Sequence, residues 1–136
     1  MDAAAWEAVR RKGDAAIKAW IDRELNGTSV TVVLIGQETV SRPYVKYEIE
    51  ESFRRKNGLL GIHIHGIKNS DRRTCRRGRN PLVDFTGMAD HPFWGFLGFR
   101  SEQRYSEIFQ TFDWVCDDGR RNMGDWIEEA ARRAGR

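Results

Sequence analysis

The most restrictive feature of the sequence is a short apolar run, Ser29 to Ile35, that ends at Gly36. The run is rich in β-branched residues, and its apolar character is nearly continuous rather than alternating. This pattern is typical of a strand buried on both faces of a parallel sheet, because a half-exposed hairpin strand would alternate apolar and polar residues. The sequence therefore predicts an interior strand of an α/β domain.

The segments on either side alternate between helical and strand patterns. Pro43 is placed for the first turn of a helix, and Val45, Ile49 and Phe53 form its inward stripe. Asn122 is a plausible N-cap for a closing helix. The other predicted elements are a helix over 2–25 that Gly13 and Asp14 can divide, and strands over 59–67 and 105–115. This order predicts a doubly wound parallel sheet flanked by helices, in one domain over residues 1–136.

The segment between the last two predicted strands departs from this alternation. Residues 68–79 are polar and turn-prone, and residues 81–104 carry many aromatic side chains without a clean period, which predicts a partly packed excursion. The basic cluster consists of Arg72, Arg73, Arg76, Arg77 and Arg79. An acidic ligand could bind there, but a solvated loop is the favoured interpretation. The aromatic residues around Trp94 could stack a base, but packing is the favoured use.

Composition limits the functional classes. With 136 residues and a net charge of +3, the chain suits a single globular domain, and nucleic acid is not an expected partner. Cys75 and Cys116 stand alone, so neither a metal site nor a disulfide framework is indicated, which fits a reducing cytoplasm. No apolar run reaches the ~18 residues of a membrane span. We expect a cytoplasmic protein without a metal or bound cofactor.

The chemistry-bearing segment follows the first predicted strand. Ligands of such sheets bind outside the carboxyl ends of the strands, and the loop after Ile35 leads from one of those ends into the helix that carries Glu48. Tyr44 lies one helical turn before Glu48 and shares its face. The residues alone thus predict a carboxylate and an aromatic ring on one face of a helix beside a ligand-binding edge.

Ser41, Tyr44 and Glu48 resemble the serine-containing loop and the aromatic-x-x-x-Glu element of TIR domains that cleave NAD. The wider chain resembles the TIR-like domain of the Thoeris antiphage system, which has a flavodoxin-like fold. The matching stretches are Asp2-Ala-Ala-Ala-Trp6, Lys12-Gly-Asp14, Thr28 to Gly36, Asn57 to Ile62, Asp113-Trp114 and Gly124 to Glu128. The resemblance spans nearly the whole sequence.

This resemblance implies an NAD glycohydrolase or ADP-ribosyl cyclase that makes a nucleotide signal for a separate effector protein, with NAD as substrate. It implies that Glu48 is catalytic, that Tyr44 stacks against nicotinamide or ribose, and that Ser41 binds a ribose hydroxyl. It also implies self-assembly through TIR-like surfaces. Relatives begin with a strand and helix that precede Asp2, so the chain is expected to be N-terminally truncated relative to them, or to begin at a misassigned start.

Plainer interpretations stay open for each residue. Glu48 could be a solvated carboxylate paired with a nearby cation, Tyr44 an amphipathic packing residue, and Ser41 a helix cap. His63 and His65 alternate along a predicted strand and face the same side, where core or edge positions are favoured over metal binding. At the level of the whole chain, the alternative is a non-catalytic signalling or assembly module, because a flavodoxin-like fold alone does not determine activity.

Overall fold

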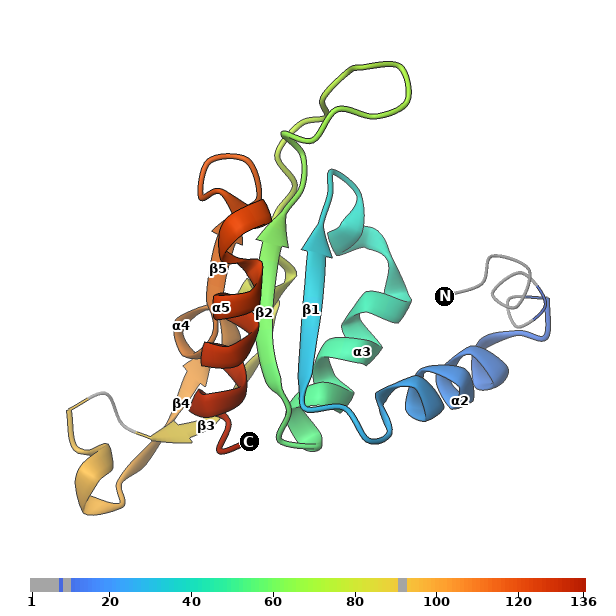
Figure 1. The fold of residues 1–136 in the computed structure, drawn as a ribbon. Helices are drawn as coiled ribbons and strands as arrows, with labels where there is room; N and C mark the ends of the chain where they lie inside the picture. The colour runs from blue at the N-terminus through green and yellow to red at the C-terminus, as the bar shows by residue number, and fades with distance from the viewer. Residues whose placement is uncertain (1–7, 9–10, 91–92) are drawn as a thin grey trace.

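The computed structural model describes residue 8, residues 11–90 and residues 93–136. Three strands form a parallel sheet in the spatial order β1-β2-β5. They are β1 (Val30–Ile35), β2 (Gly58–His63) and β5 (Gln110–Asp113). Because all three strands are parallel, their carboxyl ends lie together at one end of the sheet, as Figure 1 shows. We call this end the carboxyl edge.

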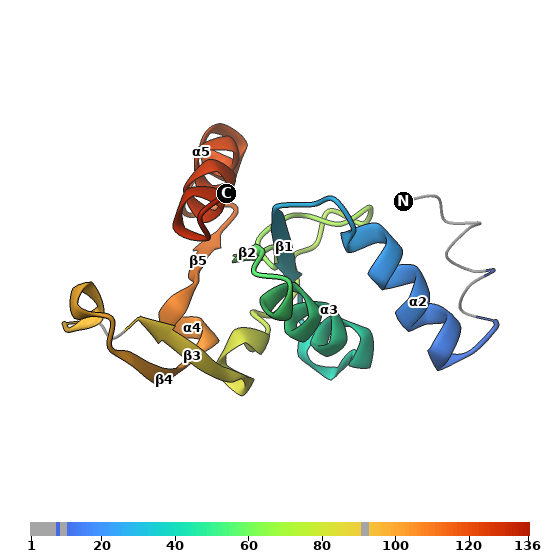
Figure 2. The same ribbon diagram turned by 90° about the horizontal axis from the view of Figure 1, so that it is seen from below.

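Helices cover both faces of this sheet. Helix α3 (Pro43–Arg54) lies on one face and α5 (Gly119–Arg133) on the other (Figures 1 and 2). Helix α2 (Asp14–Leu25) lies beside α3, beyond β1. A parallel sheet between two helical layers confirms the predicted doubly wound α/β class.

The side chains that hold the layers together follow the two faces of the sheet. On the α3 face, Ile35 and Ile49 form one cluster with other buried residues of both layers. On the α5 face, Leu60 and Ile62 pack with Ala130. The predicted inward stripe of α3 is confirmed, since Val45 and Phe53 pack against the same cluster as Ile49.

The prediction for strand β1 is confirmed in its position but not in its burial. It has the predicted position, but within the described residues it pairs with β2 alone and lies at an edge of the sheet. Leu34 is 51% exposed on the α5 face, so the prediction that both faces are covered is wrong for this residue. The apolar run specified the strand, whereas its burial depends on which elements lie beside it.

Three predicted boundaries are wrong. Strand β2 ends at His63 instead of Ile67, and α5 begins at Gly119 rather than after Asn122. The segment predicted as a strand over 105–115 begins as a helical turn, α4 (Tyr105–Ile108), and only then enters β5. Tyr105 is 5% exposed and stacks between Phe53 and Phe85, so tertiary packing fixes the turn. The beginning of the predicted 2–25 helix lies outside the described residues, and Gly13 is the N-cap of α2 with φ of 93°.

The predicted aromatic excursion contains an antiparallel hairpin that the sequence pattern did not reveal. Its strands are β3 (Thr86–Asp90) and β4 (Arg100–Arg104), paired from Thr86↔Arg104 to Asp90↔Arg100. Short 3-10 turns complete the element list, at η1 (Thr39–Ser41), η2 (Pro81–Asp84) and η3 (Gly95–Leu97). The hairpin extends away from the parallel sheet, with η3 at its tip (Figures 1 and 2).

A long loop, residues 64–80, crosses the carboxyl edge of the sheet. It returns over the end of β1, where a Cβ added to Gly78 would meet the Gly36 carbonyl oxygen at 1.9 Å. Asn80 then donates from Nδ2 to Thr111 Oγ1 on β5 at 2.9 Å. The loop is therefore attached at both outer strands and lies over the edge where ligands of such sheets bind.

Candidate active site

Helix α3 is fixed to β1 along its length. It begins eight positions after the last residue of β1, with Pro43 at its first turn, where no N–H donor is needed. Near its other end, Ser52 Oγ and Thr31 Oγ1 of β1 are 2.7 Å apart, and both side chains are buried. Glu48 lies one helical turn before Ser52, about 6 Å along the axis, so this contact determines where its carboxyl group stands relative to β1.

Glu48 is half-buried, and no described residue forms a hydrogen bond or an ion pair with its carboxyl group. Desolvation by the surrounding protein raises the pKa of Glu48 above its usual range. Burial without compensation costs free energy for a charged group, so the folded protein tolerates this position rather than gaining stability from it. No described residue supplies the cation that the interpretation of Glu48 as an ion-paired helix carboxylate requires.

Glu51, three residues further along α3, has the opposite environment. Its carboxylate accepts from Arg54, and Arg55 Nε donates to it at 3.0 Å. The hydrogen bond from Arg54, with that from Arg55, lowers the pKa of Glu51 to about 2. One helix thus carries an ion-paired carboxylate and, a turn earlier, one that no described residue pairs with, which separates a structural carboxylate from a candidate reactive one.

Tyr44 lies between α3 and α2. Its ring packs with the cluster that Ile17, Ile21 and Leu25 form on α2. Its hydroxyl is 3.5 Å from Asp14 Oδ1, a long contact. The structure therefore places Tyr44 one turn before Glu48, as predicted, with its ring half-buried against α2.

Ser41 lies in η1, before the start of α3. Its hydroxyl donates to the carbonyl oxygen of Glu38 at 2.8 Å, and the side chain is exposed. The N-cap residue of α3 is Arg42, which makes no side-chain cap hydrogen bond. Ser41 is therefore not the cap of this helix, and its hydroxyl takes part in a local turn beside the carboxyl end of β1.

A second cluster of polar side chains lies at the carboxyl ends of β2 and β5. His65 Nε2 is 3.8 Å from Asp113 Oδ2, and the rings of His63 and His65 are 5.9 Å apart, edge to face. Asp113 Oδ1 accepts the backbone N–H groups of Val115 and Cys116, which hold the pKa of Asp113 below its usual value. The sequence predicted the shared face of the two histidines, but not Asp113, because strand register brings it there.

His63 is the buried member of this group, at 3% exposure. Desolvation, together with the charge of Arg77, lowers its pKa, so the imidazole is neutral in the folded protein at neutral pH. Among the residues that the structure describes, Nδ1 of His63 has no hydrogen-bond partner, and the same holds for Nδ1 of His65. Within the described residues, no set of three or more His, Cys, Asp or Glu side chains is arranged to hold a metal ion.

The basic cluster lies in the long loop that crosses the carboxyl edge, and all five of its arginines are exposed. Arg79 forms an ion pair with Asp84 at 2.6 Å. The predicted solvated loop is confirmed in its exposure.

Among the described helices, none is long and apolar enough to cross a membrane.

Comparison with known proteins adds the family to this geometry. The family model described as Thoeris protein ThsB, TIR-like domain, matches residues 1–69. Those residues include β1, α3 and all three predicted site residues. The chain belongs to the ThsB TIR-like family.

Similarity to the ThsB family extends beyond the segment that the model matches. The chain is 31% identical, over an alignment 153 positions long, to a Bacillus cereus (strain MSX-D12) protein named "Putative cyclic ADP-D-ribose synthase ThsB1". The alignment covers 93% of this chain and 80% of that protein. The predicted resemblance to the Thoeris TIR-like domain is therefore confirmed.

Proposed function

We propose that this ThsB family member is an NAD-consuming enzyme, a glycohydrolase or an ADP-ribosyl cyclase, that makes a nucleotide signal in antiphage defence. The observation that supports the proposal most directly is the half-buried carboxyl group of Glu48, without a partner among the described residues. The name of the Bacillus cereus relative supports the substrate class, since cyclic ADP-ribose is made from NAD. A separate effector protein would sense the product.

The chemistry explains why such a carboxylate is useful. Breaking the bond between nicotinamide and ribose develops positive charge on the sugar, as in glycoside hydrolysis. A carboxylate held beside the sugar carbon of this bond either stabilises the positive charge or attacks the carbon as a nucleophile. Nicotinamide leaves readily because its ring is already cationic. Both routes need Glu48 ionised. A partly desolvated carboxylate interacts more strongly with a developing cation than a solvated one does.

The proposed supporting roles follow the placement of the other two residues. Tyr44 borders the same helix face one turn earlier, and we assign its half-buried ring to stacking against nicotinamide or ribose. Ser41 is exposed in the turn that leads into α3, and a ribose hydroxyl would compete with the Glu38 carbonyl for its hydroxyl. The final product, linear or cyclic, depends on whether water or a second group of the substrate reaches the sugar carbon.

The test is nicotinamide release from NAD by the full chain, with products separated by chromatography and identified by mass. We expect Glu48→Gln to abolish release. Glu50→Gln is the matched control, because Glu50 is an exposed carboxylate on the same helix, and this variant should retain activity. Extracts of phage-infected cells expressing each variant extend the assay to conditions that activate the enzyme.

The outcomes separate the alternatives. Equal release by Glu48→Gln and the parent chain would remove Glu48 from the reaction. A folded parent chain that binds no NAD and releases no nicotinamide in either setting would favour the non-catalytic signalling module. Nicotinamide with ADP-ribose would identify a hydrolase, and nicotinamide with a cyclic isomer would identify a cyclase.

A further inference from the structure

The tip of the β3–β4 hairpin is an unusually apolar surface. Residues 93–99 contain no charged side chain, and five of these residues are large and apolar. Their exposed fractions are 77% for Phe93, 55% for Trp94, 80% for Phe96, 60% for Leu97 and 60% for Phe99. Large exposed apolar patches of this kind mark surfaces that bind other molecules. We call these five residues the aromatic tip.

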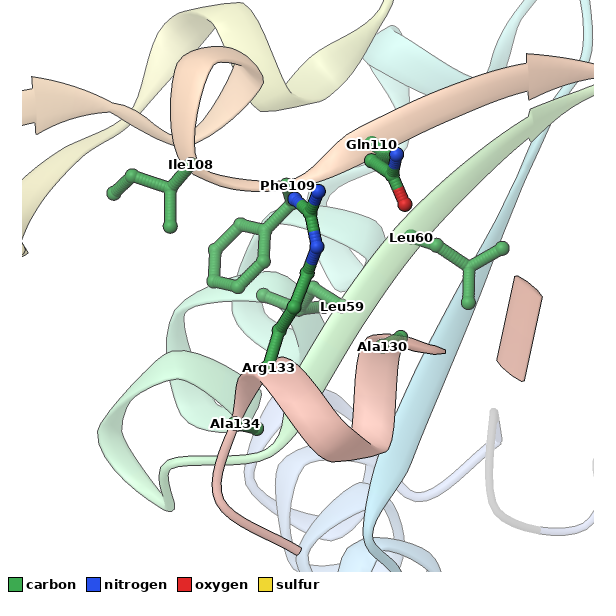
Figure 3. A pocket seen from close by; sticks show the side chains of 8 residues that line it. All are labelled: Leu59, Leu60, Ile108, Phe109, Gln110, Ala130, Arg133 and Ala134. Atoms are coloured by element: carbon green, nitrogen blue, oxygen red, sulfur yellow. The ribbon is translucent and has the colours of Figure 1, made fainter. Parts of the chain in front are cut away.

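The same chain has an apolar pocket at the amino end of its parallel sheet, shown in Figure 3. Its volume is about 220 Å³. It forms where β2 begins before β5 does, so that Leu59 has no strand neighbour on that side. Its apolar walls come from β2, the α4–β5 junction and the end of α5, namely Leu59, Leu60, Ile108, Phe109, Ala130 and Ala134. We call this hollow the end pocket.

The size and charge of the end pocket fit an aromatic ring. A cavity of about 150 Å³ with apolar walls accommodates benzene, so the end pocket has room for one phenyl ring. Its polar lining consists of Gln110 and Arg133. In Figure 3 the Arg133 side chain extends from the end of α5 toward Phe109. Its Nε donates to Glu129 Oε1 at 3.1 Å. The positive charge of the guanidinium beside the pocket would attract the electron-rich face of an inserted ring.

The aromatic tip of a chain points away from its own end pocket. In both ribbon views the tip projects outward from the parallel sheet, and Figure 2 shows the hairpin on the side of the sheet opposite to α5 (Figures 1 and 2). We propose that the aromatic tip of one copy of this protein docks into the end pocket of a second copy, with Phe96, the most exposed of the five residues, as the inserted side chain. This proposal does not depend on NAD chemistry.

The proposed contact joins two different surfaces. Each copy therefore keeps one free tip and one free pocket, and the assembly grows head to tail into a ring or a filament rather than stopping at a symmetric dimer. Removing either surface from every copy should leave monomers. Mixing a copy that lacks the tip with a copy that lacks the pocket should restore one contact and then stop.

The experiment uses sedimentation velocity of the full chain across the micromolar range. Phe96→Ser removes the inserted ring, and Gln110→Phe fills the end pocket from a strand position that accepts aromatic residues. Val115→Ser is the matched control, because Val115 is 54% exposed and follows β5 at the opposite edge of the sheet. We expect concentration-dependent assembly for the parent chain and the control, and at least tenfold weaker assembly for each of the other variants.

An equimolar mixture of Phe96→Ser and Gln110→Phe is expected to form a one-to-one dimer and nothing larger. Circular dichroism confirms folding, and Ala134→Leu replaces Gln110→Phe if that variant does not fold. A parent chain that stays monomeric, or variants that assemble like the parent, would overturn the proposal. So would a mixture that forms no dimer, or tip-dependent binding of the monomer to phosphatidylglycerol vesicles in place of assembly.

Discussion

The hydroxyl oxygens of Ser52 on α3 and Thr31 on β1 lie 2.7 Å apart in the layer between helix and sheet, with Ser52 fully buried. One hydroxyl donates to the other in a region that water does not reach, so the pair fixes the axial position of α3 against β1. Since Glu48 lies one turn away on the same helix, this buried contact connects packing to the candidate active site.

Replacing Thr31 with Val should destabilise the fold by about 1–3 kcal/mol, because it leaves the buried Ser52 hydroxyl without a partner. Denaturant unfolding measures the change. The double variant Thr31→Val with Ser52→Ala should lose less than the sum of the two single variants, since neither orphaned hydroxyl remains. Fully additive losses would mean that the two hydroxyls do not support each other.

Glu48→Gln should stabilise the protein at neutral pH. The folded state raises the pKa of Glu48, so the unfolded state loses its proton first as pH rises, and stability falls between the usual carboxyl pKa of 4.5 and the raised value. The amide removes this penalty. Melting temperatures measured from acidic to neutral pH should show that the variant becomes more stable than the parent chain only above that usual pKa. A difference in melting temperature that does not change with pH would contradict the prediction.

Glu51→Gln is expected to have the opposite effect. Arg54 and Arg55 lower the pKa of Glu51 to about 2, so its contribution to stability is complete above its ordinary pKa of 4.5 and disappears as pH falls toward 2. The same thermal measurements should show a lower melting temperature for this variant at neutral pH, and convergence with the parent chain in acid. A melting temperature equal to the parent's at neutral pH would mean that the ion pairs contribute nothing.

Acid should destabilise the protein partly through His63. Its folded-state pKa is lowered by burial, so the unfolded state takes up a proton first when pH falls below the usual 6.5, and stability decreases until the lower pKa is reached. His63→Gln has no titrating group and should show a flatter dependence in that range. Unfolding free energies measured at a series of pH values test this, and identical slopes would exclude His63 as the source.

Replacing each of two glycines with alanine should change the stability of the protein in opposite directions. A Cβ at Gly58 would meet the carbonyl oxygen of Ala130 at 2.4 Å, whereas one at Gly124 in α5 has nothing within 4 Å. Gly58→Ala should therefore separate β2 from α5 and lower stability. Gly124→Ala should raise stability by about 0.5–1 kcal/mol through helix propensity. Denaturant midpoints compare them, and equal midpoints would show that the close approach at Gly58 relaxes freely.

The sequence predicted those parts of the fold that rest on local patterns. The apolar run of β1, the proline at the start of α3 and the stripe around Ile49 all have a periodicity that one segment carries by itself. The turn at Tyr105 and the β3–β4 hairpin depend on contacts between distant segments, such as Tyr105 with Phe53, so no local pattern specified them. The environment of Glu48 follows the same rule, because the sequence shows its spacing from Tyr44 but not that it has no partner among the described residues.

The contact of Gly78 with Gly36 has a consequence for how this family can vary. The backbone of the long loop rests directly on the strand-end carbonyl, so any side chain at position 78 would push the loop off the edge of the sheet. The exposed arginines before it have no such restriction. Among related sequences we therefore expect length and charge to drift freely through the loop, while the residue at the crossing remains glycine.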